Sequence, residues 1–176
     1  MRSETWIGAV LALVLLAPTV SWARGTYLEP ERFLADVFDG APPPPRVLFL
    51  RGTVKQTVRE ILGHRYPRLR VRYWLRGPRS AWILDEIGKE RPITVGIGIE
   101  GGRVERVRVL VFRESRGDEV RHRFFTAQFD GAGLDTAQRL DRHIDNIAGA
   151  TLSVRAVKKL VRLALYLDRA VRREDG

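Results

Sequence analysis

The sequence predicts an α+β fold in which a mainly antiparallel sheet packs with helices. Two helical stretches come first, a group of strands follows, and a long amphipathic helix ends the chain. Separate runs of helices and strands, in place of alternating strand–helix units, are typical of this class. With 176 residues, the chain is long enough for one domain with a core of its own.

The first residues have the pattern of a secretory signal. Residues 7–17 form an unbroken run of apolar residues and glycine, preceded by Arg2. The small residues Ser21 and Ala23 suit cleavage after Ala23. The run is shorter than the roughly 20 apolar residues of a membrane span. We therefore expect residues 1–23 to be a signal peptide that exports the chain to the periplasm, with retention as an inner-membrane anchor as the alternative.

Residues 24–91 are expected to form an N-terminal extension of helices and strands. A short helix is predicted over residues 27–39, where Pro30 suits the first turn. A second helix is predicted to be capped by Thr53 and ended by Gly63, because these residue types favour helix starts and stops.

The strands are predicted from a change of hydrophobic period to two. Residues 69–76 alternate apolar side chains with polar ones, and residues 81–87 are expected to pair with them. Residues 93–99 and 104–111 form a second pair, joined by a glycine turn at 101–102.

Three further elements are expected in the last third of the chain. A strand is predicted over residues 120–129 and a short helix over residues 135–143. A long helix is predicted over residues 153–173, because apolar residues recur there with the period of a buried helical stripe. This part of the chain is expected to form one compact unit with the N-terminal extension.

The chain is strongly basic. Its 31 Lys and Arg exceed its 21 Asp and Glu, which gives a formal net charge of +10. Such a charge points to nucleic acid, an anionic membrane surface or an acidic protein, although 27 of the 31 are Arg and a coding bias toward Arg could also produce it. The predicted export argues against nucleic acid. A row of arginines on one strand is interpreted either as a solvated face or as a surface for an acidic partner or lipid head groups: Arg68, Arg70, Arg72 and Arg76.

Some chemistry is excluded by composition. The chain has no cysteine, so it has no disulfide framework, no Cys-ligated metal and no thiol catalysis. Its three histidines are scattered, and no metal site is predicted.

The segment before the long helix carries the clearest functional pattern. It reads Asp145-Asn146-Ile147-Ala148-Gly149-Ala150-Thr151-Leu152-Ser153. Small residues let a ligand approach the backbone, and the free N–H groups of a helix start suit a phosphate. Arg155, Lys158 and Lys159 add positive charge nearby. The alternative is that Thr151 or Ser153 caps the helix, and spacing alone favours this second interpretation.

A second segment, Glu114-Ser115-Arg116-Gly117, follows an apolar strand. Its charges alternate and Gly117 permits a tight turn. Taken alone, it is interpreted as a solvated hairpin end.

Residues 145–151 resemble the flavinylation motif of the FMN-binding domain family, which is Asp, two variable residues, Ser or Thr, Gly, Ala and Thr. This family includes the C subunit of the sodium-pumping NADH:quinone reductase and the G subunit of the Rnf complex. The resemblance implies that a flavin transferase takes FMN from FAD and joins its phosphate to Thr151 as a phosphoester. Residues 114–117 are similar to the family's Glu-Thr-Pro-Gly loop beside the flavin. The resemblance runs from about Pro92 to Arg173 and implies an FMN-binding domain over residues 92–176.

The chain departs from the family pattern at a few positions. Ala148 replaces the usual Ser or Thr, and Arg116 replaces Pro. Asp118 and Glu119 replace the Leu-Gly continuation of the loop. These changes affect the flavin pocket more than the attachment residue.

The resemblance implies an exported, membrane-associated flavoprotein that carries covalent FMN in electron transport. An electron carrier is favoured over an enzyme with its own substrate, because the sequence contains no recognisable pair of a catalytic nucleophile and a base. The implied partners are the FAD-using flavin transferase and a membrane-bound or periplasmic redox protein, for which an acidic surface would match the basic chain. The alternatives are a basic extracytoplasmic binding module without flavin, which Ala148 favours, and a flavin-dependent enzyme. Thr151 is the predicted attachment site, and the other predicted cofactor-binding residues are Asp145, Ile147, Ala148, Gly149, Ala150, Leu152, Ser153, Glu114, Ser115, Arg116 and Gly117.

Overall fold

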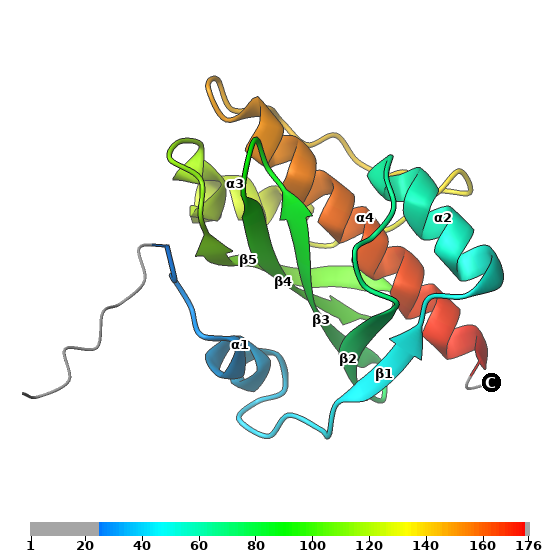
Figure 1. Cartoon of the computed structure of the whole chain (residues 1–176). Helices are drawn as coiled ribbons and strands as arrows, with labels where there is room; N and C mark the ends of the chain where they lie inside the picture. Colours follow the sequence, from blue (N-terminus) through cyan, green and yellow to red (C-terminus); the bar gives the residue numbers. More distant parts are fainter. Residues whose placement is uncertain (1–24, 175–176) are drawn as a thin grey trace, which may run out of the picture.

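The fold is built on one five-stranded antiparallel sheet. The computed structural model describes residues 25–174, so the predicted signal segment lies outside the described residues (Figure 1). The strands follow one another across the sheet in chain order. They are β1 (Arg46–Phe49), β2 (Arg70–Arg76), β3 (Arg79–Ile87), β4 (Pro92–Glu100) and β5 (Arg103–Phe112). The predicted strand pairs and the tight turn at residues 101–102 are confirmed.

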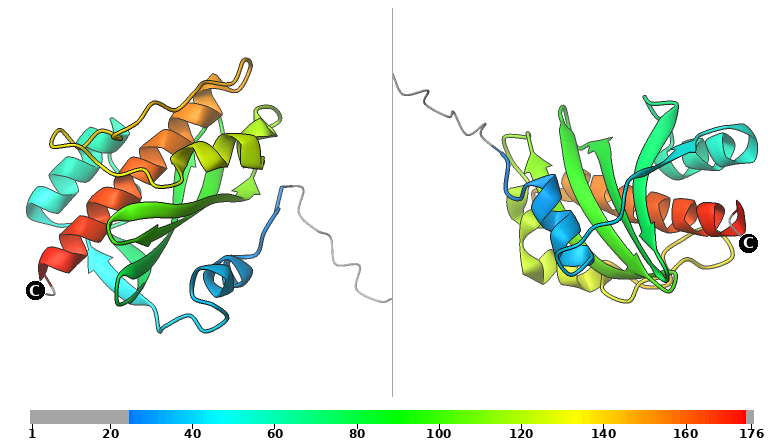
Figure 2. Two further views of the ribbon diagram at one scale, coloured as in Figure 1. Left: turned by 180° about the vertical axis from the view of Figure 1, so that it is seen from behind. Right: turned by 90° about the horizontal axis from the view of Figure 1, so that it is seen from below.

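Helices cover both faces of this sheet. Figure 2 shows α2 and α4 on one side and α1 on the other. The helices are α1 (Pro30–Val37), α2 (Gly52–Leu62), α3 (Arg123–Thr126) and α4 (Thr151–Glu174). The stripe along α4 is buried against the sheet in the main core, and α1 builds a smaller core on the opposite face. The predicted α+β class is confirmed. Among the described residues, no helix has the length and apolar character needed to cross a membrane.

The start of α2 differs from the prediction. Arg51 is the cap residue and makes no side-chain cap hydrogen bond, while Thr53 lies inside the first turn. The predicted stop is confirmed, because Gly63 takes a left-handed conformation with φ 76° and ends the helix.

The predicted strand over residues 120–129 is wrong. This stretch folds into short helical turns: η1 (Asp118–Arg121), α3 and η2 (Ala127–Phe129). Val120, Phe125 and Phe129 are fully buried whereas Phe124 is exposed. Buried positions four or five residues apart suit a helical turn, and a strand would have buried alternate residues.

The predicted helix over residues 135–143 is also wrong. Leu134 and Leu140 form an isolated bridge that closes a loop. Asp135 accepts hydrogen bonds from the backbone N–H and the side chain of Arg139, and Asp141 accepts one from the N–H of Gly133. Aspartate side chains that bind nearby backbone groups compete with helix formation, and here they hold the loop.

Candidate functional site

Thr151 is the first residue of α4, so it lies where the N–H groups of the helix have no partner within the helix. Its exposed hydroxyl accepts a hydrogen bond from Asn146 Nδ2 at 3.1 Å. Ala150 precedes the helix, and its carbonyl accepts the hydrogen bond of the Val154 N–H at 2.9 Å, so Ala150 occupies the cap position. Thr151 and Ser153 lie inside the helix, so the alternative in which one of them caps it is wrong, and the Thr151 side chain is exposed.

The turn before Thr151 leaves room for a ligand. The N–H of Ala150 donates to the carbonyl of Ile147 at 3.0 Å, which closes the turn. Gly149 has φ +82°, and a Cβ placed on it would meet no atom within 4 Å. Ala148 and Gly149 are exposed, so the backbone at this turn is open to approach.

A groove of about 340 Å³ runs from Thr151 along α4. Ile61 of α2 forms its far wall, and the other lining residues are Asn146, Thr151, Val154, Arg155, Lys158, Lys159 and Arg162. Arg155 is four residues after Thr151 and Lys158 is seven, which places both on the same side of the helix as Thr151. Arg155, Lys158 and the helix start therefore lie on the side of the Thr151 hydroxyl, and Lys159 and Arg162 extend the positive charge along the groove. This arrangement suits a ligand carrying a phosphate.

The second predicted segment lies against this turn. Gly117 has φ +87°, and a Cβ placed on it would lie 2.6 Å from Ser153 Oγ and 3.5 Å from the Ala150 Cα. Ser153 is buried at this contact. The structure therefore brings together two segments that are more than thirty residues apart in the chain.

Gly117→Ala is expected to destabilise the protein by about 1–2 kcal/mol. A left-handed conformation disfavours a Cβ, and the new methyl group would also overlap Ser153 Oγ. Chemical denaturation measures the loss. Gly102→Ala is the matched control, because Gly102 has φ +76° and open space around it, so it isolates the backbone penalty. The added cost at Gly117 should disappear in the Gly117→Ala/Ser153→Ala double variant; equal costs at Gly117 and Gly102 would contradict the contact.

Glu114 anchors the same loop to the β3–β4 turn. Its Oε1 accepts hydrogen bonds from the backbone N–H groups of Lys89, Glu90 and Arg91, at 2.5, 2.7 and 2.8 Å. Burial raises the pKa of Glu114, but these three donors and the charge of Lys89 outweigh burial and hold the pKa below its ordinary value.

The lowered pKa of Glu114 predicts an acid-sensitive contribution to stability. A carboxylate with a lowered folded-state pKa stabilises the protein above the ordinary Glu value of about 4.3, and the contribution is lost as the pH falls through the folded-state pKa. Glu114→Gln should therefore lower the free energy of unfolding at neutral pH and flatten its fall below about pH 4.3. Denaturant titrations across this range measure both effects. Glu119→Gln, an exposed change in the adjacent turn, is the control, and an identical pH profile in the two variants would refute the prediction.

The other predicted residues take varied positions. Asp145 is exposed, its carboxylate lies 3.4 Å from His143 Nε2, and its N–H donates to Gln128 Oε1. Ile147 packs partly against the main core. Leu152, Ser115 and Arg116 are exposed. Ser115 also lines a second hollow of about 750 Å³, together with Glu114.

Four residues of the groove are missing from the sequence prediction: Asn146, Val154, Arg162 and Ile61. Asn146 occupies a variable position of the motif. A polar amide five residues before Thr151 was the sequence signal that could have identified it, and in the structure this amide donates to the Thr151 hydroxyl. Arg162 lies two helical turns after Arg155, at the far end of the groove, so helical spacing could have identified it. Ile61 comes from α2, and sequence spacing gives no signal for it.

Trp74 and Trp82, two aromatic residues of β2 and β3, are used for packing. Trp82 is fully buried and stacks on Tyr73 with ring centroids 5.0 Å apart. Trp74 packs against the α1 core on the opposite face of the sheet.

Comparison with known protein families gives one match. Residues 88–166 match the FMN-binding domain. This range includes the loop at 114–117, the turn at 145–150 and Thr151. No curated protein matches the chain at a significant level. The exposed hydroxyl, the open glycine turn and the surrounding cations fit the phosphate of FMN. Residues 88–166 are therefore similar to the FMN-binding domain family, and this match supports a flavin-binding protein with FMN as its cofactor.

Proposed function

We propose that this protein carries FMN covalently on Thr151 through a phosphoester and works as an electron carrier. The observation that carries the proposal is the placement of Thr151: an exposed hydroxyl at the first residue of α4, at the end of a groove lined by cations. The family match supports FMN as the group that is held.

Attachment requires a phosphoryl transfer to the Thr151 hydroxyl. The Thr151 oxygen forms a bond to the FMN phosphorus of FAD, the bond from that phosphorus to the AMP phosphate oxygen breaks, and AMP leaves. The hydroxyl proton passes to a base of the flavin transferase. Asn146 donates to the Thr151 oxygen at 3.1 Å, so it fixes the direction of the hydroxyl before transfer.

The chain's charges suit the product. A phosphodiester keeps one negative charge, which the free N–H groups at the start of α4 and the side chains of Arg155 and Lys158 would stabilise. Lys158 Nζ donates to the carbonyl of Ile144 at 3.3 Å, so its position is tied to the segment that leads into the motif.

Bound FMN supplies the redox chemistry, and the protein supplies attachment, orientation and charge. Because Thr151 is exposed, a flavin held there would lie near the surface, where a partner protein could exchange electrons with it. The predicted leader sequence supports a location outside the cytoplasm, where a covalent bond prevents loss of a cofactor that is hard to replace. A membrane-bound or periplasmic redox protein is the proposed partner.

Co-expression with a flavin transferase tests the proposal. We expect a fluorescent band on a denaturing gel and a mass increase equal to FMN less one water. Without the transferase, the band should be dark. The loaded protein should then be reduced and reoxidised reversibly with no small substrate added. A dark band with an active transferase would contradict covalent attachment.

A further inference from the structure

The positive charge of this chain is concentrated in one unit. Residues 46–76, which comprise β1, α2 and β2, contain nine Lys and Arg and a single acidic residue, Glu60. This unit therefore carries +8 of the chain's net +10. It lies entirely before residues 88–166, so the FMN-binding domain match assigns it no role. We call the surface of residues 46–76 the basic edge.

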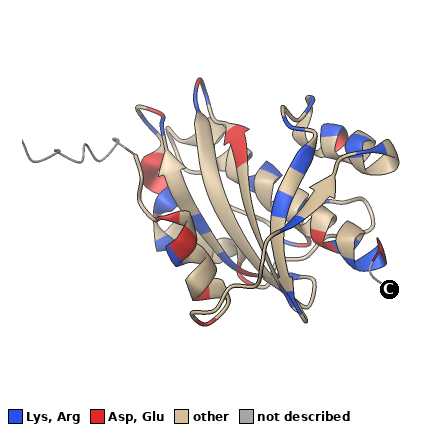
Figure 3. Ribbon diagram, turned by 60° about the horizontal axis from the view of Figure 1, so that its bottom comes forward, with Lys and Arg blue, Asp and Glu red and all other residues tan. Residues whose placement is uncertain are grey.

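The cations of the basic edge lie at the protein surface. All nine are exposed, and Figure 3 shows Lys and Arg gathered on this side of the sheet. Arg68 pairs with Asp85 at 3.0 Å. Arg70 and Arg72 have no carboxylate partner among residues 25–174. Charges without internal partners contribute little to the fold and are free to attract an anionic surface.

Apolar side chains are exposed among these cations. Leu69, Phe49 and Val47 are 66%, 50% and 46% exposed. Val47 is paired with Arg72 across the strands and Phe49 with Arg70. Paired residues share a face of the sheet, so the arginines and the apolar side chains of these two pairs alternate on one exposed face at the sheet edge. Leu69 lines the hollow on the other side of that edge.

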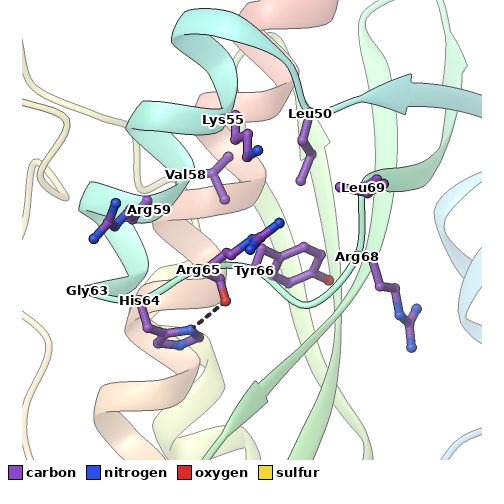
Figure 4. A pocket seen from close by; sticks show the side chains of 10 residues that line it. All are labelled: Leu50, Lys55, Val58, Arg59, Gly63, His64, Arg65, Tyr66, Arg68 and Leu69. Carbon is purple, nitrogen blue, oxygen red and sulfur yellow. Dashed lines mark hydrogen bonds between the residues drawn. The ribbon is translucent and has the colours of Figure 1, made fainter.

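A hollow of about 430 Å³ opens on the other side of the same edge, between α2 and residues 63–69. Its basic residues are Lys55, Arg59, His64, Arg65 and Arg68, and its apolar walls are Leu50, Val58, Tyr66 and Leu69. Figure 4 shows Lys55 and Arg65 lying over the space between α2 and the 63–69 segment, whereas Arg68 leads away from it. The positive charges of Lys55 and Arg65 therefore lie over the apolar residues of the hollow, and an anion bound between them would offset their repulsion.

We propose that the basic edge docks on the surface of an anionic lipid bilayer, with a lipid phosphate at Lys55 and Arg65. Arginines would contact head groups, and Phe49, Leu69 and Val47 would enter the boundary with the acyl chains. An acidic protein would match the charge alone. A bilayer matches both the cations and the exposed apolar side chains between them.

Vesicle co-sedimentation with the full chain tests this docking. Vesicles of equal parts phosphatidylglycerol and phosphatidylcholine should bind the protein at physiological salt, and pure phosphatidylcholine vesicles should not. Arg70→Gln/Arg72→Gln should weaken binding about 30-fold, because each cation near an anionic bilayer adds to the attraction. Phe49→Ser/Leu69→Ser should weaken it about tenfold and make the remainder more sensitive to salt.

The matched control removes the same charge elsewhere. Arg123→Gln/Arg139→Gln changes two arginines that are exposed and lie outside residues 46–76, so binding should change less than twofold. All variants share one N-terminus, so its contribution cancels in these ratios. Circular dichroism confirms that each variant is folded.

Several results would overturn the proposal. Equal losses in the two arginine doubles would mean that net charge alone drives binding. Unchanged vesicle binding in Arg70→Gln/Arg72→Gln, together with loss of binding to a polyglutamate peptide, would assign the surface to an acidic protein. Displacement of the protein from vesicles by low concentrations of free glycerol phosphate would assign the hollow to a soluble anion. The measurement uses protein without flavin, so its outcome is independent of attachment at Thr151.

Discussion

Thr151→Val is expected to abolish covalent flavin while the fold stays intact. Valine has the shape and β-branching of threonine but lacks the oxygen that would bond to phosphorus. The side chain is exposed, so the free energy of unfolding should change by no more than about 0.5 kcal/mol. After co-expression with the transferase, band fluorescence should fall to background, and the mass should equal that of the unmodified chain.

Two controls separate the hydroxyl from its setting. Thr151→Ser keeps an oxygen at the same place and should keep measurable fluorescence. Thr53→Val removes another exposed threonine hydroxyl in the first turn of a helix, in α2, and should leave fluorescence unchanged. Fluorescence that survives in Thr151→Val, with the full FMN mass, would place the bond on another residue.

The main elements of the fold follow from hydrophobic period. The strands β2 to β5 have one or both faces buried. A strand with one buried face alternates apolar and polar residues, and a strand with two buried faces is a continuous apolar run, so both patterns can be recognised in the sequence. The stripe of α4 repeats over 24 residues, which is long enough to define a helix unambiguously. Its start, Thr151, lies two residues before the predicted start, because helix ends depend on local backbone bonds that period does not report.

The region between β5 and α4 could not be predicted in the same way. Its elements are no longer than four residues, and side chains such as Asp135 and Asp141 bind backbone groups there. These hydrogen bonds depend on the folded path of the backbone, so they cannot be predicted from composition or from hydrophobic period. Short apolar runs such as residues 120–129 remain ambiguous between strand and helix.

The site itself was only partly accessible from sequence. The motif predicts Thr151 as the attachment residue, and the family pattern predicts a role for the loop at 114–117. The contact of Gly117 with Ser153 and the wall that Ile61 gives the groove join segments distant in the chain. Such contacts are products of the tertiary fold. A single sequence contains no signal for them.

The buried carboxylate of Asp168 ties the end of α4 to the sheet. It is 0% exposed, it accepts a hydrogen bond from Ser80 Oγ at 2.7 Å, and it accepts two from Arg172 Nε at 3.1 and 3.0 Å. Ser80 in turn accepts a bond from Trp82 Nε1 at 3.0 Å. The Arg172 guanidinium also donates to the carbonyls of Gly77 and Pro78 in the β2–β3 turn, at 3.0 and 2.7 Å.

Asp168→Ala is therefore expected to lower the free energy of unfolding by about 3 kcal/mol. The change leaves the Ser80 hydroxyl without its acceptor and Arg172 without its counter-charge, and breaking one side of a buried pair costs far more than the pair contributes. Asp36→Ala is a close control, because Asp36 forms an ion pair with Arg32 four residues away in a helix, as Asp168 does with Arg172. The Asp36 pair differs in being exposed to solvent, and Asp36 Oδ1 lies 3.6 Å from Arg32 Nε. Its loss should cost at most about 0.5 kcal/mol. If Asp168→Ala yields too little folded protein, Asp168→Asn keeps an acceptor for Ser80 and should give a measurable, intermediate loss. Denaturation midpoints for Asp168→Asn and Asp36→Ala that coincide with the wild type would show that this network does not hold the helix to the sheet.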